Sequence, residues 1–477
     1  MSFVIRRSLF NWAAAAAIVG LCAVPAAQAA PGDPLTPAFD VRAELVERQS
    51  ASAVARAADG STVIVWQDGG ANAIVGRRYA ADGSPLDDGF VIATAVPTVD
   101  RLLAPDVAMD AAGNFVVVWL VGDTRESTVT DRRPSRVQGR RYTADGVPAG
   151  TLLTPDAANP AATHSVPAVA VAADGDFVLS FKHGFMRVGS DVLSVNGEEL
   201  LAQRYDRDGL AQGALITAAR IDANLDSNLG VPYVLLVGID LQTFTGSPVD
   251  IAIADDGAFV LAWVDRATTD VTLYTIYKLF NLGQSRSTDV LRVRRYAANG
   301  TARGPAQRIA TGRTFTSDST LGNFENPIVS APRVAMAANG AQYVVSWIES
   351  AFDGRHRRPV YAQTFGADGR ALSVERLYGD SSENPRVSAV AMNASGEFIL
   401  SWGGAAGIMA RLAGADGGPL TGAITVAART RTELLYDSDV AMDRDGNVAV
   451  TWTRATDFSS REANEIVRAR LLMGPRP

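Results

Sequence analysis

Pairs of short hydrophobic runs, each pair joined by a polar turn, recur along the chain. Val107–Trp119 is a clear copy, in which two apolar runs flank a turn that contains Asp110 and Gly113. Turns of this kind supply the positive φ angles of tight hairpins, so each copy predicts a β-hairpin. The seven copies are Val54–Trp66, Val107–Trp119, Val169–Phe181, Ile251–Trp263, Val334–Trp347, Val390–Trp402 and Val440–Trp452.

A third and a fourth strand follow each hairpin. Gly139-Arg140-Arg141-Tyr142 shows the third strand, and Asp145-Gly146 shows the turn that ends it. Phe90–Ile92 is an example of the fourth strand, and no helical period occurs after residue 29. The second strand, such as Phe115–Trp119, is apolar on both faces and must be covered on both sides. The pattern predicts an all-β fold: a single seven-bladed β-propeller with four antiparallel strands per blade.

The two ends of the chain predict how this ring closes. The last copy stops after its third strand, at Leu472. Its missing fourth strand has a counterpart near the other end, because Gly32-Asp33-Pro34-Leu35 resembles Gly83-Ser84-Pro85-Leu86 of the first blade. We therefore expect residues 31–43 to complete blade 7, so that the N-terminal strand closes the last blade.

Residues 1–29 have the pattern of an export signal peptide. Arg6 and Arg7 precede an apolar run, and Ala27-Gln28-Ala29 is a small-x-small cleavage sequence. The run is too short for a membrane anchor, and no later segment predicts a transmembrane helix. The expected mature chain, residues 30–477, contains no cysteine, because the single cysteine is Cys22. We expect it to be periplasmic or secreted, and monomeric.

The repeats resemble those of a bacterial family. The V-A-M-D-x-x-G-x-F-V-V-x-W pattern, followed by R-Y-x-A-D-G, is similar to repeats of secreted and cell-surface bacterial proteins. The resemblance covers nearly all of residues 30–477 and implies the propeller architecture and a bacterial, extracytoplasmic protein. It implies no activity, because the family shares no catalytic motif that can be carried over to this chain.

The charge balance and the absence of common catalytic and nucleotide-binding motifs narrow the range of functions that we expect. The net charge of −7 becomes −9 when Arg6 and Arg7 are removed (−7 − 2 = −9), so we expect no nucleic-acid partner. The chain has no H-E-x-x-H, G-x-S-x-G, G-x-x-x-x-G-K or G-x-G-x-x-G motif. We expect no cofactor, with calcium as the one ion considered.

The lengths of the connections predict which face of the propeller carries function. The turns between strands one and two, and between strands three and four, are short. The long segments belong to the opposite face, where binding loops are expected. These segments are 121–135, 182–198, 222–248, 264–289, 312–331, 348–358 and 453–464.

The first candidate site lies at the start of the innermost strands, near the mouth of the channel. Equivalent positions in the repeats hold Ala53, Asp106, Ala168, Asp250, Arg333, Ala389 and Asp439. Three acids and one arginine around an opening suit a cation, such as calcium, or a polar ligand. The alternative is that Asp106, Asp250, Arg333 and Asp439 make ion pairs and hydrogen bonds between blades.

The second candidate site lies two residues beyond the aromatic end of strand two. These positions hold Asp68, His183, Asp265, Glu349 and Arg454. Asp265 and Glu349 belong to adjacent blades and suit an acid and base in glycoside cleavage if they lie about 5–10 Å apart. The alternative is that charged strand ends simply face water.

The third candidate site is basic. Arg132 and Arg133 lie in one long loop, and Arg355, Arg357 and Arg358 flank His356 in another. Guanidinium groups suit the carboxylate or sulfate groups of acidic polysaccharides, whereas the alternative is solvated loop charge.

Three functions remain open from the sequence. The first is a non-catalytic binding or scaffold module for a protein or glycan partner that meets the loop-rich face. The second is a propeller glycoside hydrolase or polysaccharide lyase that uses carboxylates from adjacent blades. The third is a structural protein of the cell envelope, and the fold alone does not choose among them.

Overall fold

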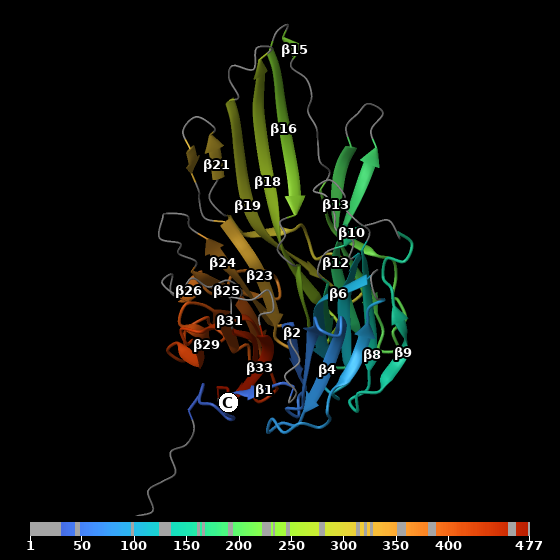
Figure 1. Cartoon of the computed structure of the whole chain (residues 1–477), viewed down its shortest axis with the longest axis vertical. Coiled ribbons are helices and arrows are strands. Elements are labelled where there is room, and N and C mark those ends of the chain that lie inside the picture. Colours follow the sequence, from blue (N-terminus) through green and yellow to red (C-terminus); the bar gives the residue numbers. More distant parts are fainter. Residues whose placement is uncertain are drawn as a thin grey trace, which may run out of the picture.

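Seven antiparallel sheets surround a central axis and form the predicted seven-bladed β-propeller. Figure 1 shows the disc from the side. The predicted fold class is therefore confirmed. Among the described residues, no helix is long and apolar enough to cross a membrane. The computed structural model describes residues 30–42, 48–96, 100–123, 135–159, 163–164, 167–188, 194–221, 230–231, 234–244, 249–275, 282–311, 315–318, 322–324, 328–350, 359–379, 388–456 and 464–475.

Each blade is built from the strands of one repeat. Blade 1 contains β2 (Gln49–Arg56), β3 (Thr62–Asp68), β4 (Ala73–Tyr79) and β5 (Phe90–Thr94). Blade 2 contains β6 (Asp100–Met109), β7 (Phe115–Asp123), β8 (Arg136–Tyr142) and β9 (Pro148–Leu153). Blade 3 contains the short β10 (Thr163–His164) and β11 (Ala168–Val171), then β12 (Phe177–Val188), β13 (Ser194–Tyr205) and β14 (Ile216–Ile221).

The remaining blades follow the same plan. Blade 4 contains β17 (Asp250–Ile253), β18 (Phe259–Thr275), β19 (Leu282–Tyr296) and β20 (Gln307–Thr311). Blade 5 contains β23 (Ile328–Met336), β24 (Gln342–Ser350), β25 (Val360–Gly366) and β26 (Arg376–Gly379). Blade 6 contains β27 (Ser388–Met392), β28 (Phe398–Gly403), β29 (Gly407–Ala413) and β30 (Ile424–Ala428). Blade 7 contains β31 (Glu433–Met442), β32 (Val448–Thr456), β33 (Asn464–Leu472) and β1 (Phe39–Asp40).

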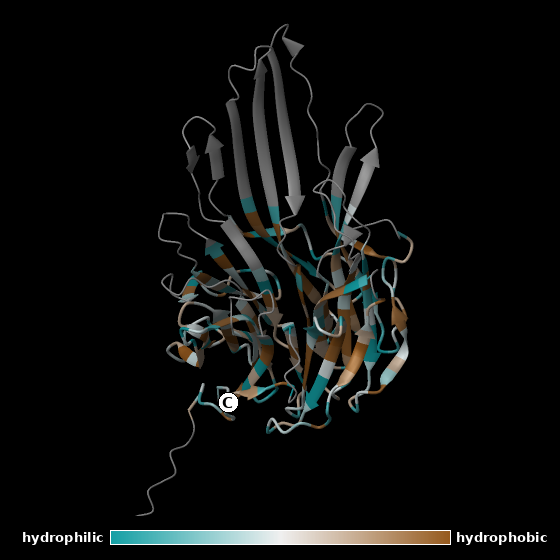
Figure 2. Cartoon of the chain, viewed as in Figure 1, coloured by the Kyte–Doolittle hydropathy of each residue, from teal (hydrophilic) through white to brown (hydrophobic). Residues whose placement is uncertain are grey.

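The repeat tryptophans fill the seams between neighbouring blades. Trp263 of blade 4, for example, packs with Ala168, Val178 and Leu200 of blade 3. Each strand two has a neighbouring blade on both sides, which explains why it is apolar on both faces. Hydrophobic residues accordingly gather along the strands of the disc (Figure 2). The fully buried tryptophans are Trp66, Trp119, Trp263, Trp347, Trp402 and Trp452.

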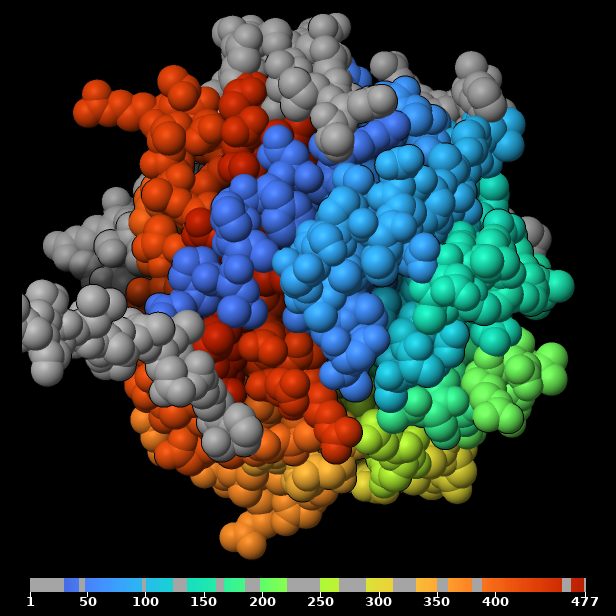
Figure 3. All heavy atoms as spheres, turned by 90° about the horizontal axis from the view of Figure 1, so that it is seen from below, coloured from blue at the N-terminus to red at the C-terminus, as the bar shows by residue number. Residues whose placement is uncertain are grey.

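The N-terminal strand completes blade 7. Strand β1 pairs antiparallel with β33, and Pro34 forms an isolated bridge with Leu472. Val41 is fully buried, and its carbonyl oxygen accepts a hydrogen bond of 2.6 Å from the Tyr79 hydroxyl of blade 1. The N-terminal and C-terminal segments lie side by side on the lower face of the disc (Figure 3). The predicted closure by the N-terminal strand is confirmed.

Two of the long segments of the opposite face, 222–248 and 264–289, contain extended strands where we expected irregular loops. Residues 124–134, 351–358 and 457–463 of other long segments lie outside the described residues. Strands β18 and β19 continue beyond blade 4 and pair with each other up to Leu273 and Leu282. Strand β16 (Val234–Phe244) pairs along the other edge of β18, and this ribbon projects from the disc (Figure 1). Runs such as Val271-Thr272-Leu273-Tyr274 consist of residue types that favour strands, so backbone pairing continues past the blade. The ribbon also includes β15 (Gly230–Val231), β21 (Phe315–Asp318) and β22 (Gly322–Phe324).

Candidate functional site

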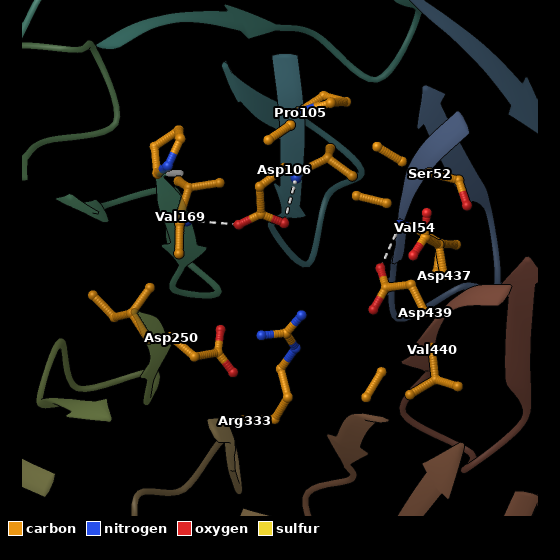
Figure 4. A pocket seen from close by; sticks show the side chains of 18 of the residues that line it. Ser52, Val54, Pro105, Asp106, Val169, Asp250, Arg333, Asp437, Asp439 and Val440 are labelled. Atoms are coloured by element: carbon orange, nitrogen blue, oxygen red, sulfur yellow. Dashed lines mark hydrogen bonds between the residues drawn. The ribbon is translucent and has the colours of Figure 1, made fainter. Parts of the chain in front are cut away.

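A cavity of about 420 Å³ lies on the propeller axis, where the innermost strands converge. It lies on the face from which the ribbon projects. Its lining residues stand at the starts of the innermost strands, whereas the short turns follow the other ends of these strands. All seven channel positions identified in the repeats line it: Ala53, Asp106, Ala168, Asp250, Arg333, Ala389 and Asp439. We call this space the axial cavity (Figure 4).

Recurring β-bulges shape the wall of the axial cavity. In β2, β6, β23 and β31, pairing with the second strand skips two residues immediately before the channel position. A bulge bends its strand and redirects the neighbouring side chains. Ala51, Ala104 and Asp437 occupy these bulges with φ angles of +50°, +47° and +52°. Strained backbone of this kind concentrates at functional sites, and all three residues line the cavity.

Three of the acids also join neighbouring blades. Oδ2 of Asp106 accepts a hydrogen bond of 2.8 Å from the backbone N–H of Val169 in blade 3. Asp250 does the same with Val334 of blade 5 at 2.7 Å. Asp439 accepts from Val54 at 2.9 Å, which links blade 7 to blade 1. These bonds satisfy backbone donors on the otherwise unpaired inner edges of the strands.

Burial in the axial cavity disfavours ionisation of these acids. It raises the pKa of Asp106 to about 7, to which the nearby charges of Asp439 and Asp250 add. It raises the pKa of Asp439 to about 6, although Arg333 opposes this change. The pKa values of Asp250 and Asp437 are also raised by burial and opposed by Arg333. Arg333 is therefore the positive charge that acts on Asp250, Asp437 and Asp439.

The guanidinium of Arg333 lies among the carboxylates of the axial cavity. Figure 4 shows the guanidinium of Arg333 with the carboxylates of Asp106, Asp250 and Asp439 around it. Within the described residues, no ion pair of 4.0 Å or less joins Arg333 to the carboxylates that line the cavity. Nη1 of Arg333 donates a hydrogen bond of 3.2 Å to the carbonyl oxygen of the preceding residue, Pro332. Separated donors and acceptors around a cavity can bind a ligand that bridges them.

The structure does not bring Asp265 and Glu349 together. Side chains alternate along a strand, so Asp265 faces blade 3, as Trp263 does. Glu349 shares the side of Trp347, which packs against the other face of blade 4. The sheet of blade 4 therefore lies between the two carboxylates. This arrangement does not support the acid–base pair that we considered from the sequence.

The other residues of the second candidate site lie in three other seams between blades. Asp68 is fully buried and lies 2.9 Å from Nη1 of Arg42. Nδ1 of His183 lies 3.1 Å from Oδ2 of Asp156. Nη1 of Arg454 lies 3.4 Å from Oε1 of Glu433. Each position therefore holds a local polar contact at the end of its own seam, instead of contributing to one shared site.

A buried lysine lies near Asp265 in the seam between blades 3 and 4. Burial lowers the pKa of Lys182 to about 8, and the carboxylates of Glu198 and Asp265 oppose that change. Asp265 also accepts hydrogen bonds from Trp263, at 2.6 Å, and from Arg292. Sequence reasoning missed this network, although Lys182 is one of only two lysines in the chain.

The basic candidates and the metal candidate gain no support. Arg132 and Arg133, and the group Arg355, Arg357 and Arg358, lie outside the described residues. Within the part of the chain that the structure describes, no group of three or more His, Cys, Asp or Glu side chains is placed to hold a metal ion.

Comparisons with known proteins add likenesses to solved structures. No family model and no curated protein matches the chain. An ulvan lyase of polysaccharide lyase family 25 is 8% identical, with a TM-score of 0.48, over 93% of this chain and 94% of that one. A Dyadobacter fermentans protein of unknown function is 12% identical, with a TM-score of 0.43, over 79% and 96%. A Penicillium chrysogenum α-L-arabinanase is 11% identical, with a TM-score of 0.36, over 77% and 94%.

The neighbours therefore include glycoside hydrolases and polysaccharide lyases, at low identity. Because the TM-scores are below 0.5, these likenesses carry no argument about the function of this chain.

Proposed function

We propose that this protein is a binding propeller that holds the end of a glycan in its axial cavity. The observation that supports this proposal is the convergence of Asp106, Asp250, Asp437, Asp439 and Arg333 on one cavity while Arg333 stays unpaired with these acids. A volume of about 420 Å³ lies within the range of small-ligand sites, roughly 300–1,000 Å³.

The charges of the axial cavity define the chemistry of the ligand. Four carboxylates and one guanidinium favour a ligand with several hydrogen-bond donors and at least one acceptor. Sugar hydroxyls and amino groups donate to carboxylates, whereas a ring or carbonyl oxygen accepts from Arg333. An amino sugar fits best, because its ammonium group also offsets the excess negative charge. We propose that binding takes place outside the cytoplasm, in the periplasm or the medium, with the protein as a monomer.

The test uses variants that change charge while preserving the fold. Asp439→Asn retains an oxygen that accepts the hydrogen bond from Val54, and Arg333→Ala removes the central cation. Asp88→Asn is the matched control, because Asp88 is exposed beside the short turn between β4 and β5. The probes are neutral, amino and acidic oligosaccharides, and the measurements are melting temperature and calorimetric affinity.

We expect amino oligosaccharides to raise the melting temperature of the natural protein. Asp439→Asn and Arg333→Ala should each weaken binding about 10- to 100-fold, the cost of one charge-assisted hydrogen bond. Asp88→Asn should bind like the natural protein. Equal affinity in all four proteins would refute the axial cavity as the binding site.

The raised pKa values in the same cavity favour a second candidate, acid–base cleavage of a glycan. With pKa values of about 7 and about 6, Asp106 and Asp439 can exchange protons near neutral pH. Turnover of a bound oligosaccharide that falls at least 100-fold in Asp106→Asn, while binding persists, would support this candidate. Bound oligosaccharide that is recovered intact after prolonged incubation would leave the protein as a binder.

A further inference from the structure

The backbone nitrogen of Ala30 is held against a carboxylate. It donates a hydrogen bond of 2.6 Å to Oδ2 of Asp33. In return, the backbone N–H of Asp33 donates to the carbonyl oxygen of Ala30 at 3.0 Å. Residues 30–33 therefore form a tight turn, which we call the N-terminal turn, and both Ala30 and Asp33 are exposed to solvent.

The N-terminal turn is fixed to the end of blade 7. The N–H of Gly32 donates to the carbonyl oxygen of Met473 at 2.7 Å, and the N–H of Met473 donates to the carbonyl oxygen of Asp33 at 2.8 Å. Gly32 is buried with φ of +89°, a backbone conformation that strains any other residue, and a Cβ there would also come within 2.5 Å of Cδ1 of Ile424 on β30. The glycine therefore favours this position of the turn.

The residues directly before the N-terminal turn form a processing sequence. Ala27 and Ala29 are the small residues that a leader peptidase requires, and cleavage after Ala29 makes Ala30 the first residue. Hydrolysis of the Ala29–Ala30 bond adds water, leaving a carboxylate on Ala29 and an amine on Ala30. That amine takes up a proton at neutral pH, because its ordinary pKa is about 8. A neutral amide donor thereby becomes a positive ammonium group.

We propose that removal of the leader at Ala29–Ala30 is a maturation step that creates an ion pair between the new N-terminal ammonium and Asp33, and that this pair fastens the closing strand of blade 7. The nitrogen already lies at hydrogen-bond distance from the carboxylate, so the pair forms without rearrangement. Charge-assisted hydrogen bonds are stronger than neutral ones, although an exposed pair is partly screened by salt. The uncleaved chain has the same contact without the charge.

The first measurement is the intact mass of the exported protein. A mass corresponding to residues 30–477 is the expected result, and any other first residue overturns the proposed cleavage position. This result is independent of ligand binding in the axial cavity, so it separates the present proposal from the proposed function.

The second measurement isolates the ion pair. Two proteins are compared by hydrogen exchange: residues 30–477 with Ala30 as the first residue, and the same chain with one additional glycine before Ala30. The backbone N–H groups of Leu35 and Val41 report on the closing strand, because they bond to the carbonyl oxygens of Leu471 and Val467. At pH 7 and low salt we expect their exchange to be about 2- to 5-fold slower with the native N-terminus.

Two controls assign the effect to the ion pair. Asp33→Asn should abolish the difference between the two proteins, because the amide retains hydrogen bonding but carries no charge. The difference should also disappear at pH 10, where the N-terminal amine is neutral. Equal exchange in the two proteins at pH 7, or a difference that survives in Asp33→Asn, would overturn the proposal.

Discussion

Nε of Arg56 in blade 1 lies 3.0 Å from Oδ2 of Asp443 in blade 7, with both side chains almost fully buried. The pair joins the first repeat to the last, at the seam where the ring closes. Arg56 departs from the repeat, because the other six blades have methionine, valine or isoleucine at this position. Oδ1 of Asp443 also accepts the backbone N–H of Asn447, so this carboxylate serves its own turn and the neighbouring blade.

We expect Arg56→Met to lower the free energy of unfolding by about 3 kcal/mol, because it leaves a buried carboxylate without its counter-charge. The measurement is denaturant unfolding at pH 7. The double variant Arg56→Met/Asp443→Asn should recover most of the loss, since blade 6 has Asn393 at the position equivalent to Asp443. Equal losses in the single and double variants would show that the charge pair is not the cause.

The second prediction concerns pH and Asp106. Its pKa is about 7 in the folded chain, against about 3.9 in an unfolded chain, so folding takes up a proton between these values. The contribution of Asp106 to stability is therefore complete below about pH 4 and is lost as the pH rises through 7. Asp106→Asn keeps a permanently neutral side chain, but its amide can accept only one of the two backbone hydrogen bonds, from Val107 and Val169, that the carboxylate accepts. Its stability relative to the natural chain should therefore rise by about 2 kcal/mol between pH 5 and pH 8.

The comparison is made by denaturant unfolding of the natural protein and Asp106→Asn at pH 5 and pH 8. The stability of Asp106→Asn relative to the natural protein should be higher at pH 8. Asp88→Asn, an equal charge change far from the cavity, serves as the control. A difference that is the same at both pH values would contradict the titration of Asp106.

The third prediction concerns ring closure. Deletion of residues 31–43 removes β1, uncovers β33 and removes the carbonyl oxygen that accepts from Tyr79. It also leaves the fully buried Asp68 without Arg42. We expect the melting temperature to fall by at least about 10 °C, because the loss includes a buried ion pair as well as a strand. An unchanged melting temperature would contradict the closing role of this segment.

The fourth prediction concerns the bulges of the axial cavity. Ala104 has φ of +47°, in the region that glycine adopts without strain. Ala104→Gly should therefore raise the free energy of unfolding by about 1 kcal/mol. If the bulge holds the cavity ready for a ligand, the same substitution should weaken amino-oligosaccharide binding. Ala112→Gly in the neighbouring short turn is the control, and greater stability in that variant alone would contradict the assigned strain.

Most of the fold was predictable from the sequence, because the fold is repetitive. A strand that is apolar on both faces, such as Phe115–Trp119, must be covered on both sides, as it is in a stack of sheets. The seven copies of the repeat determine the number of blades. The likeness of Gly32–Leu35 to Gly83–Leu86 was enough to place the closing strand. The projecting ribbon was not predictable in the same way, because β16 and the outer half of β18 occur once and have no repeat to align with.

The candidate site was predictable only in part. Aligned repeats placed Asp106, Asp250 and Asp439 at one level of the axis. Asp437 was missed because a bulge, which has no sequence signature here, brings it to the cavity two residues before the expected position. Asp265 and Glu349 looked like neighbours because their blades are adjacent, but strand alternation puts a whole sheet between them.

The pairing of β1 with β33 has a consequence for how the chain can be cut and rejoined. Because Asp33 and Met473 are hydrogen-bonded neighbours, a short linker can join the two ends without disturbing a blade. New ends can then be opened at a short turn such as Asp174-Gly175, on the face away from the ribbon. Such circular permutants keep every strand contact, so each blade can be made the last to be synthesised. The order in which the blades are synthesised can therefore be changed while the architecture of the ring stays the same.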